Sequence, residues 1–181
     1  MAATTTPDAA ALQLFAAHPT LVRVGSLAGM IGCLLVVPAV LGVFRLAPRS
    51  RSVLVGGSLM IAGYICYLSV LSSGFTTLAM AEHGRATDDF IAVLDAAQQQ
   101  WWTTWVFVLF AVGNLIGTFV FAIGLIRSGA VPAWAALGIL AWPPLHVFGL
   151  LFLGNEVPQV IGAVLQAAGF AGCAWARWRR S

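Results

Sequence analysis

The chain has 181 residues, of which 60% are hydrophobic and 8% charged, and its formal net charge is +3. A soluble domain carries about a quarter charged residues, so a water-soluble fold is excluded because it could not bury this much apolar surface. The nine basic residues are all arginine and lie at the ends of apolar stretches rather than on one face, which excludes a nucleic-acid-binding protein.

Five stretches of the chain run for about the thickness of a membrane without a charged side chain. A bilayer core about 30 Å thick needs roughly 20 apolar residues of helix to cross it. The pattern therefore predicts an all-α integral membrane protein, a five-helix bundle in one domain that covers residues 1–181. The predicted helices cover about residues 24–45, 53–79, 101–126, 132–153 and 157–176.

The N-terminal region has no basic segment before an apolar run, so no cleavable signal peptide is expected. Residues 9–17 instead predict a short interfacial helix, with Leu12, Leu14 and Phe15 against the lipid headgroups. Small residues let membrane helices approach closely. Helix seams are therefore expected at Gly25, Gly29, Gly32, Gly113, Gly117, Gly162, Ala168 and Gly172.

The arginines predict the orientation, because positive residues stay on the cytoplasmic side. With five crossings, seven arginines fall on one side and only Arg23 and Arg85 on the other. The N-terminus is then outside the cell and the C-terminus is cytoplasmic. The acidic loop between the second and third helices is outside.

This outer loop contains a second amphipathic pattern. Thr87 can cap a helix that starts at Asp88, where negative charge in the first turn is favourable. Apolar residues from Phe90 to Ala97 give the segment one apolar side. We expect a short amphipathic helix on the outer membrane surface.

The third and fourth helices carry most of the tryptophans. Trp101, Trp102 and Trp105 mark the outer interface, where the amphipathic indole ring is favourable. In the fourth helix, Trp142 is followed by Pro143 and Pro144, which remove two backbone donors and predict a kink.

Polar side chains are concentrated in the predicted outer halves of the helices, which suggests a cavity that opens outward. Hydrogen bonds between helices are the simpler explanation for most of the hydroxyl groups. The residues expected to bind a substrate are Tyr64, Tyr67, Trp101, Trp105, Asn114, Trp142 and Gln166.

Three groups are candidates for proton transfer: Glu156, His146 and Asp95. Glu156 precedes the fifth helix, where capping is the simpler explanation. His146 is the one histidine within a span, and a hydrogen bond to a carbonyl freed by the prolines would also explain it. No cofactor and no metal are expected, because no two histidines face each other and no Cys-x-x-Cys pair occurs.

The stretch WWTTWVFVLFAVGNLIGTFVFAIGLIRSGAVPAWAALGILAWPPLHVFG resembles small actinobacterial multi-pass proteins of uncharacterised function. More weakly, the chain resembles membrane-integral terpene cyclases, small helical bundles with aromatic pockets and an acid. That resemblance implies protonation of a prenyl double bond or epoxide, followed by ring closure, with Glu156 or Asp95 as the acid. Its aromatic rings would stabilise the cations.

These patterns favour a membrane-embedded enzyme of the bacterial inner membrane that acts on a lipophilic isoprenoid by acid catalysis. The partners expected are the lipid bilayer and a lipophilic small molecule. Two other functions fit the same sequence: a non-enzymatic accessory or sensor subunit, and a small transporter. An accessory subunit would bind a protein partner through the outer loop or the cytoplasmic arginine tail.

Overall fold

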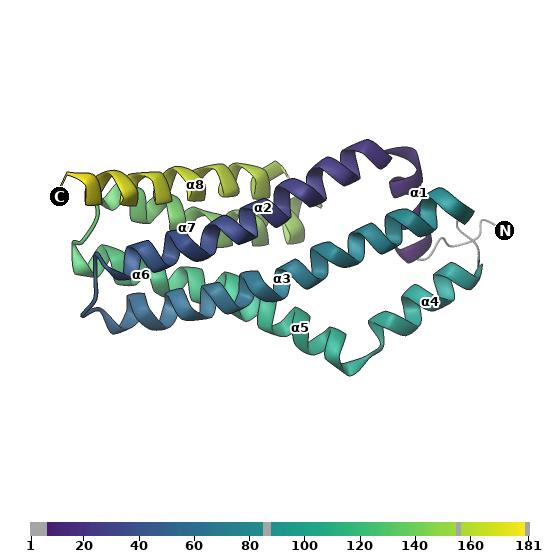
Figure 1. Cartoon of the computed structure of the whole chain (residues 1–181), viewed down its shortest axis with the longest axis horizontal. Coiled ribbons are helices and arrows are strands. Elements are labelled where there is room, and N and C mark those ends of the chain that lie inside the picture. The colour runs from purple at the N-terminus through teal and green to yellow at the C-terminus, as the bar shows by residue number, and fades with distance from the viewer. Residues whose placement is uncertain (1–6, 85–87, 155–156, 180–181) are drawn as a thin grey trace. The chain divides into compact units, whose positions relative to one another are not determined.

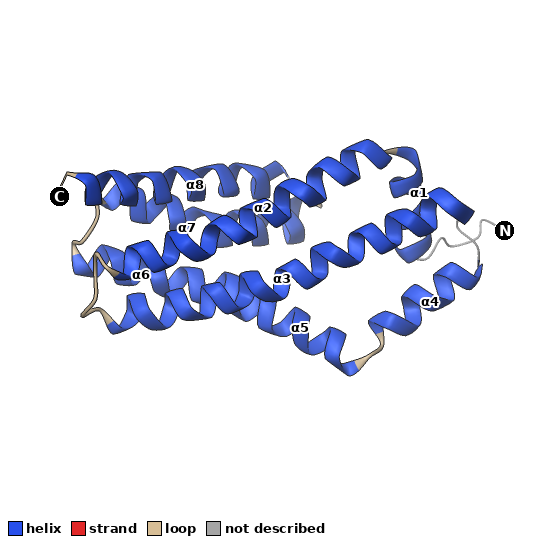
Figure 2. Cartoon of the chain, viewed as in Figure 1, coloured by secondary structure: helices blue, strands red, loops and turns tan. Residues whose placement is uncertain are grey.

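The computed structural model describes residues 7–84, 88–154 and 157–179, and these residues form helices joined by short connections, with no strand (Figure 2). Figure 1 labels the α-helices in chain order. Two further segments, η1 and η2, are π-helical. The elements are α1 (Pro7–Ala17), α2 (Pro19–Phe44), α3 (Arg51–Gly84), α4 (Asp88–Gln98), α5 (Trp101–Ala111), η1 (Val112–Gly117), α6 (Thr118–Ser128), α7 (Ala133–Phe148), η2 (Gly149–Leu153) and α8 (Val157–Trp178).

Five helices are long and apolar enough to cross a membrane, which confirms the predicted all-α, multi-pass architecture. Two of them extend beyond the uncharged stretches: α2 begins at Pro19 and α3 ends at Gly84. The reason is an ion pair, in which Arg23 Nη2 donates to both carboxylate oxygens of Glu82, at 2.6 and 2.8 Å. Paired charges can remain in helices near the membrane surface, so the charged residues do not end these helices.

The chain divides into two compact units. Unit 1 comprises Met1–Leu34 and Ile65–Leu109, and unit 2 comprises Leu35–Tyr64 and Phe110–Ser181. The prediction that residues 1–181 form one domain stays a prediction.

In unit 1, α2 and α3 run antiparallel. Gly29 lies so close to Leu71 that an added Cβ would be 3.1 Å from its side chain, and further along the pair Arg23 meets Glu82. Helix α4 contacts α1. Helix α4 occupies the segment where a surface helix was predicted, but its position on the outer membrane surface stays a prediction.

Helix α1 also forms where a short helix was expected, but one of its predicted lipid contacts is wrong. Leu12 is buried in the protein, with 1% of its surface exposed, whereas Leu14 is exposed. Side chains two positions apart on a helix point in different directions, and the contact with α4 takes up part of the helix surface.

Glycines hold the helices of unit 2 at close distances. An added Cβ at Gly113 would be 2.5 Å from the Leu59 carbonyl oxygen and from Gly63 Cα, and one at Gly117 would be 2.8 Å from the Met60 nitrogen. Helix α7 packs along α8. There, an added Cβ at Gly169 would be 2.5 Å from the carbonyl oxygen of Ala135.

The predicted glycine seams are therefore correct in part. Gly113, Gly117, Gly162 and Gly172 all lie against a neighbouring helix. In α8, however, the packed residue is Gly169, and the predicted Ala168 is exposed. Gly25 and Gly32 have no atom within 4 Å of an added Cβ, so they do not form a seam.

Both prolines of the fourth span lie inside α7, which continues past them into η2. A π-helical turn contains one extra residue and is often found at functional positions. The predicted kink at these prolines stays a prediction.

Candidate functional site

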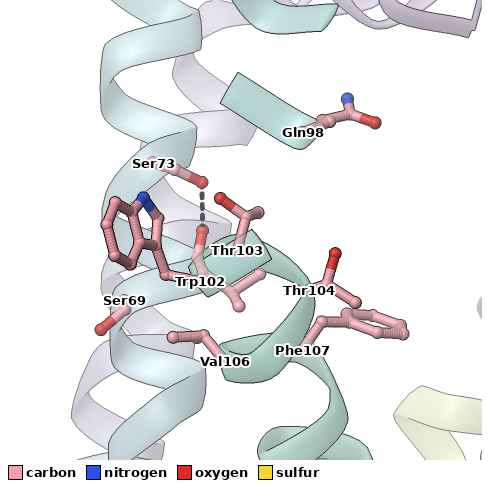
Figure 3. Close-up of a pocket in the computed structure, with 9 residues that line it drawn as sticks. Ser69, Ser73, Gln98, Trp102, Thr103, Thr104, Val106 and Phe107 are labelled. Atoms are coloured by element: carbon pink, nitrogen blue, oxygen red, sulfur yellow. Dashed lines mark hydrogen bonds between the residues drawn. The ribbon is translucent and has the colours of Figure 1, made fainter. Parts of the chain in front are cut away.

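Unit 1 contains a partly open groove of about 590 Å³ between α3, α4 and α5 (Figure 3). Its walls combine five polar side chains with aromatic and aliphatic ones, and none of the lining residues is charged. The lining residues are Ser69, Val70, Ser73, Gln98, Trp102, Thr103, Thr104, Val106 and Phe107.

Two hydroxyl groups of the groove donate to the backbone. Ser73 Oγ donates to the Val70 carbonyl oxygen at 2.7 Å, the dashed line in Figure 3, and Thr103 Oγ1 donates to the Ala97 carbonyl oxygen at 2.8 Å. Their oxygen lone pairs remain available as acceptors. Ser69 and Thr104 bring two further hydroxyls to the same walls, so the groove offers both donors and acceptors to an uncharged polar group.

The sequence-predicted residues of unit 1 lie around this groove rather than in its lining. Asp95 is half-buried on α4, three residues before Gln98, and so shares a helix face with a lining residue. Trp101 and Trp105 are exposed, and the indole in the groove is that of Trp102. Tyr67 is half-buried on α3 outside the lining.

Unit 2 holds a buried polar cluster, consisting of Tyr64, Asn114, Thr118 and Gln166. The hydroxyl of Tyr64 on α3 donates to Gln166 Oε1 on α8 at 2.9 Å, and both residues are buried. A polar side chain at membrane depth is stable only when it faces protein or water. This hydrogen bond therefore fixes one face of α8 towards α3.

Asn114 and Thr118 lie at the same packing interface. The rings of Phe121 and Phe170 are 6.3 Å apart, which brings α6 against α8. Thr118 and Gln166 are each one helical turn before these rings, and Asn114 is one turn further. Asn114 and Thr118 are 1% and 0% exposed, and their side chains have no hydrogen-bond partner among the described residues.

Trp142 and His146 form a stacked pair on α7. Their ring centroids are 5.0 Å apart with an angle of 10° between the planes. The His146 Nδ1 atom is buried and has no partner in the described chain. The third catalytic candidate, Glu156, lies outside the described residues.

The cluster makes opposite predictions for two of its members. Tyr64→Phe removes the hydrogen bond to Gln166 and is expected to cost about 0.6–1 kcal/mol, typical of hydrogen bonds between membrane helices. Asn114→Leu has nearly the same shape and removes two unpartnered polar atoms, so the variant is expected to be at least as stable as the wild type. Unfolding in mixed micelles with increasing denaturing detergent measures both.

A larger loss of stability in Asn114→Leu than in Tyr64→Phe would contradict this expectation. It would show that the Asn114 amide is held by a bound partner in the membrane. Thr118→Val, which removes a neighbouring buried hydroxyl, provides the matched comparison.

The site residues predicted from sequence thus divide between the two units. Tyr64, Asn114, Trp142, His146 and Gln166 belong to unit 2, and Tyr67, Asp95, Trp101 and Trp105 to unit 1. The sequence did not single out Trp102 and Phe107 as lining residues, although their spacing of five from the Trp-rich helix start was visible. In the parts of the chain that the structure describes, no group of three or more His, Cys, Asp or Glu side chains is arranged to hold a metal ion.

The groove and the cluster show the kind of protein this is: a multi-pass helical membrane protein with uncharged polar groups placed at specific helix contacts. Comparisons with protein-family models, with curated proteins and with solved structures give no match to this chain.

Proposed function

We propose that this chain is an enzyme of the bacterial inner membrane that binds a lipophilic isoprenoid in the groove of unit 1 and cyclises it after protonation. The observation that carries the proposal is the lining of the groove, which combines Trp102 and Phe107 with four hydroxyl groups and no charge. Its volume lies within the roughly 300–1,000 Å³ of small-molecule sites, whose walls are mostly apolar with a few polar groups.

The uncharged lining favours a prenyl alcohol, ether or epoxide over a prenyl diphosphate. A diphosphate needs arginine, lysine or a divalent cation close to its oxygens. Hydroxyl groups such as those of Ser69 and Thr104 suit a single neutral oxygen. The partly open groove would admit such a molecule directly from the bilayer.

Asp95 is the acid that fits this site best, because it shares a face of α4 with Gln98. When it carries its proton, the carboxyl group transfers that proton to the terminal double bond, whose π electrons form the new C–H bond. The next double bond attacks the resulting cation and forms the ring C–C bond. The carboxylate then removes a proton from the carbon beside the final cation, so the product is an isomer and no co-reactant is consumed.

The ring faces of Trp102 and Phe107 would stabilise the intermediate cations. The predicted orientation, with the N-terminus outside, belongs to the same proposal. It places the groove near the outer surface, because the loop that contains α4 is the acidic, arginine-poor one.

Filling the groove tests the proposal. Ser73→Phe places a ring in the lining and is expected to lower photocrosslinking of a benzophenone-bearing farnesol to 102–107 at least tenfold, because the ring takes the space of the ligand. Ser72→Phe is the matched control, since Ser72 is exposed beside the groove and its hydroxyl bonds a backbone carbonyl three residues earlier, as that of Ser73 does. Mass spectrometry of the crosslinked peptides measures both variants.

Equal crosslinking in Ser73→Phe and Ser72→Phe would contradict the groove as the binding site. Wild-type protein that crosslinks no prenyl probe would overturn the proposed function and favour an accessory, sensor or transport role. Specific binding without any product by gas chromatography would leave a lipophile-binding protein and overturn the enzymatic part.

A further inference from the structure

One end of unit 2 is uniformly basic. Glycine contacts bring the end of α6 against the start of α3, where an added Cβ at Gly124 would be 2.8 Å from the Val53 nitrogen. They also bring the end of α8 against the start of α7, at Gly172 and Trp134. The described parts of unit 2 contain no Asp or Glu. The arginines at this end are Arg45, Arg49, Arg51, Arg127, Arg177 and Arg179.

A small pocket of about 190 Å³ lies at this end, between α2 and α8. Arg177 is its single charged lining residue, and the others are apolar side chains, glycine and a thiol. The lining residues are Pro38, Ala39, Gly42, Val43, Leu46, Phe170, Cys173, Ala174 and Arg177.

The guanidinium of Arg177 is not engaged by the protein. No ion pair or hydrogen bond joins it to another described residue, whereas the guanidinium carbon of Arg179 lies 3.8 Å from the ring centroid of Trp175. Arg177 lines the pocket and belongs to the last turn of α8, where the chain leaves the apolar layer. It is therefore free to bind an anion at the mouth of an apolar pocket.

Space for an apolar chain is provided by Gly42. An added Cβ there would meet no atom within 4 Å, so the missing side chain leaves open room beside the pocket. The pocket has space for on the order of six groups the size of a water molecule, which is also about the size of a methylene group.

We propose that this pocket binds an anionic phospholipid. The phosphate accepts hydrogen bonds from Arg177, and one acyl chain lies in the apolar part of the pocket, against Phe170 and over Gly42. Arginine presents a planar fork of donors that fits phosphate oxygens. Basic pockets between membrane helices bind anionic headgroups by this chemistry. The excess of arginines around the site selects against zwitterionic lipids, because these carry a cationic group beside the phosphate.

Native mass spectrometry of the full chain, titrated with dioleoyl phosphatidylglycerol, tests the proposal. Wild-type protein is expected to bind this lipid at least tenfold more tightly than dioleoyl phosphatidylcholine. Arg177→Gln is expected to weaken binding about fivefold, from the contribution of one arginine at an anionic surface. Arg127→Gln removes the same charge from the same end but does not line the pocket, and a change of less than twofold is expected.

A filling variant separates the pocket from the surface charge. Gly42→Leu places a side chain in the open space and is expected to lower lipid retention at least threefold with all arginines in place. Size-exclusion chromatography and circular dichroism verify that each variant is folded. Equal weakening by Arg177→Gln and Arg127→Gln, no effect of Gly42→Leu, or equal binding of phosphatidylcholine would each overturn the proposal. Competition by inorganic phosphate at the lipid's own concentration would show an anion site without lipid specificity, and would overturn it too.

Discussion

The Gly113→Ala variant will be less stable than the wild type by about 2–3 kcal/mol. Its Cβ would be 2.5 Å from the Leu59 carbonyl oxygen and from Gly63 Cα, so backbone rather than a flexible side chain must move. Overpacking of this kind costs about 1–3 kcal/mol. Alanine gains only about 1 kcal/mol in helix propensity, and the steric cost is at the upper end because two backbones are separated. Thermal unfolding in detergent measures the loss.

Gly42→Ala is the matched control in the same unit. No atom lies within 4 Å of its added Cβ, so the variant has the gain in helix propensity without the steric cost. It is expected to be as stable as the wild type or more stable by up to about 1 kcal/mol. Equal stability of Gly113→Ala and Gly42→Ala would contradict the close contact between α3 and η1.

Asp95→Asn will lower the rate of isoprenoid cyclisation about 100-fold or more, while crosslinking of the benzophenone farnesol persists. An amide cannot donate the initiating proton, and a positioned general acid contributes about 10²–10⁴-fold to a rate. Conversion of farnesol or a prenyl epoxide by purified protein in nanodiscs, analysed by gas chromatography, measures the effect. Separate readouts for binding and turnover distinguish a chemical role from loss of the site.

Asp89→Asn is the matched control for this experiment. Asp89 is exposed in the first turn of α4 and carries the same charge on the same helix. Its variant is expected to retain at least half of the wild-type rate. Full turnover in Asp95→Asn would remove Asp95 from the mechanism, and loss of turnover in Glu156→Gln alone would transfer the role to Glu156.

The membrane spans were predictable because charge and hydropathy report directly on the solvent around a helix. The helix ends were less predictable. Arg23 and Glu82 each argued for a boundary when considered alone, but they pair across α2 and α3 and remain within those helices. Pairing between residues 59 positions apart leaves no local signal in the sequence.

The faces of the helices were the harder problem. In a bilayer, lipid tails and neighbouring helices are equally apolar, so hydropathy does not distinguish a packed residue from a lipid-facing one. Ala168 and Gly169 are adjacent small residues, yet only Gly169 lies against α7. Trp102 lines the groove and Trp101 is exposed for the same reason: the geometry of helix contacts, not residue type, selects the indole.

The candidate polar residues were predictable as a set but not as pairs. Tyr64 and Gln166 were both identified by their polarity within apolar spans, and their hydrogen bond depends on how α3 and α8 are packed. Thr118 gave no distinct signal, because threonine within a span commonly bonds its own backbone.

The π-helical turn at Val112–Gly117 limits how the length of this chain can change in evolution. Each residue advances an α-helix by about 100°. Deleting a single residue from this turn would restore α-helical geometry and rotate all that follows, turning Phe121 and Leu125 from the protein interior towards lipid. Insertions and deletions among homologous chains should therefore accumulate at the helix connections and avoid this turn.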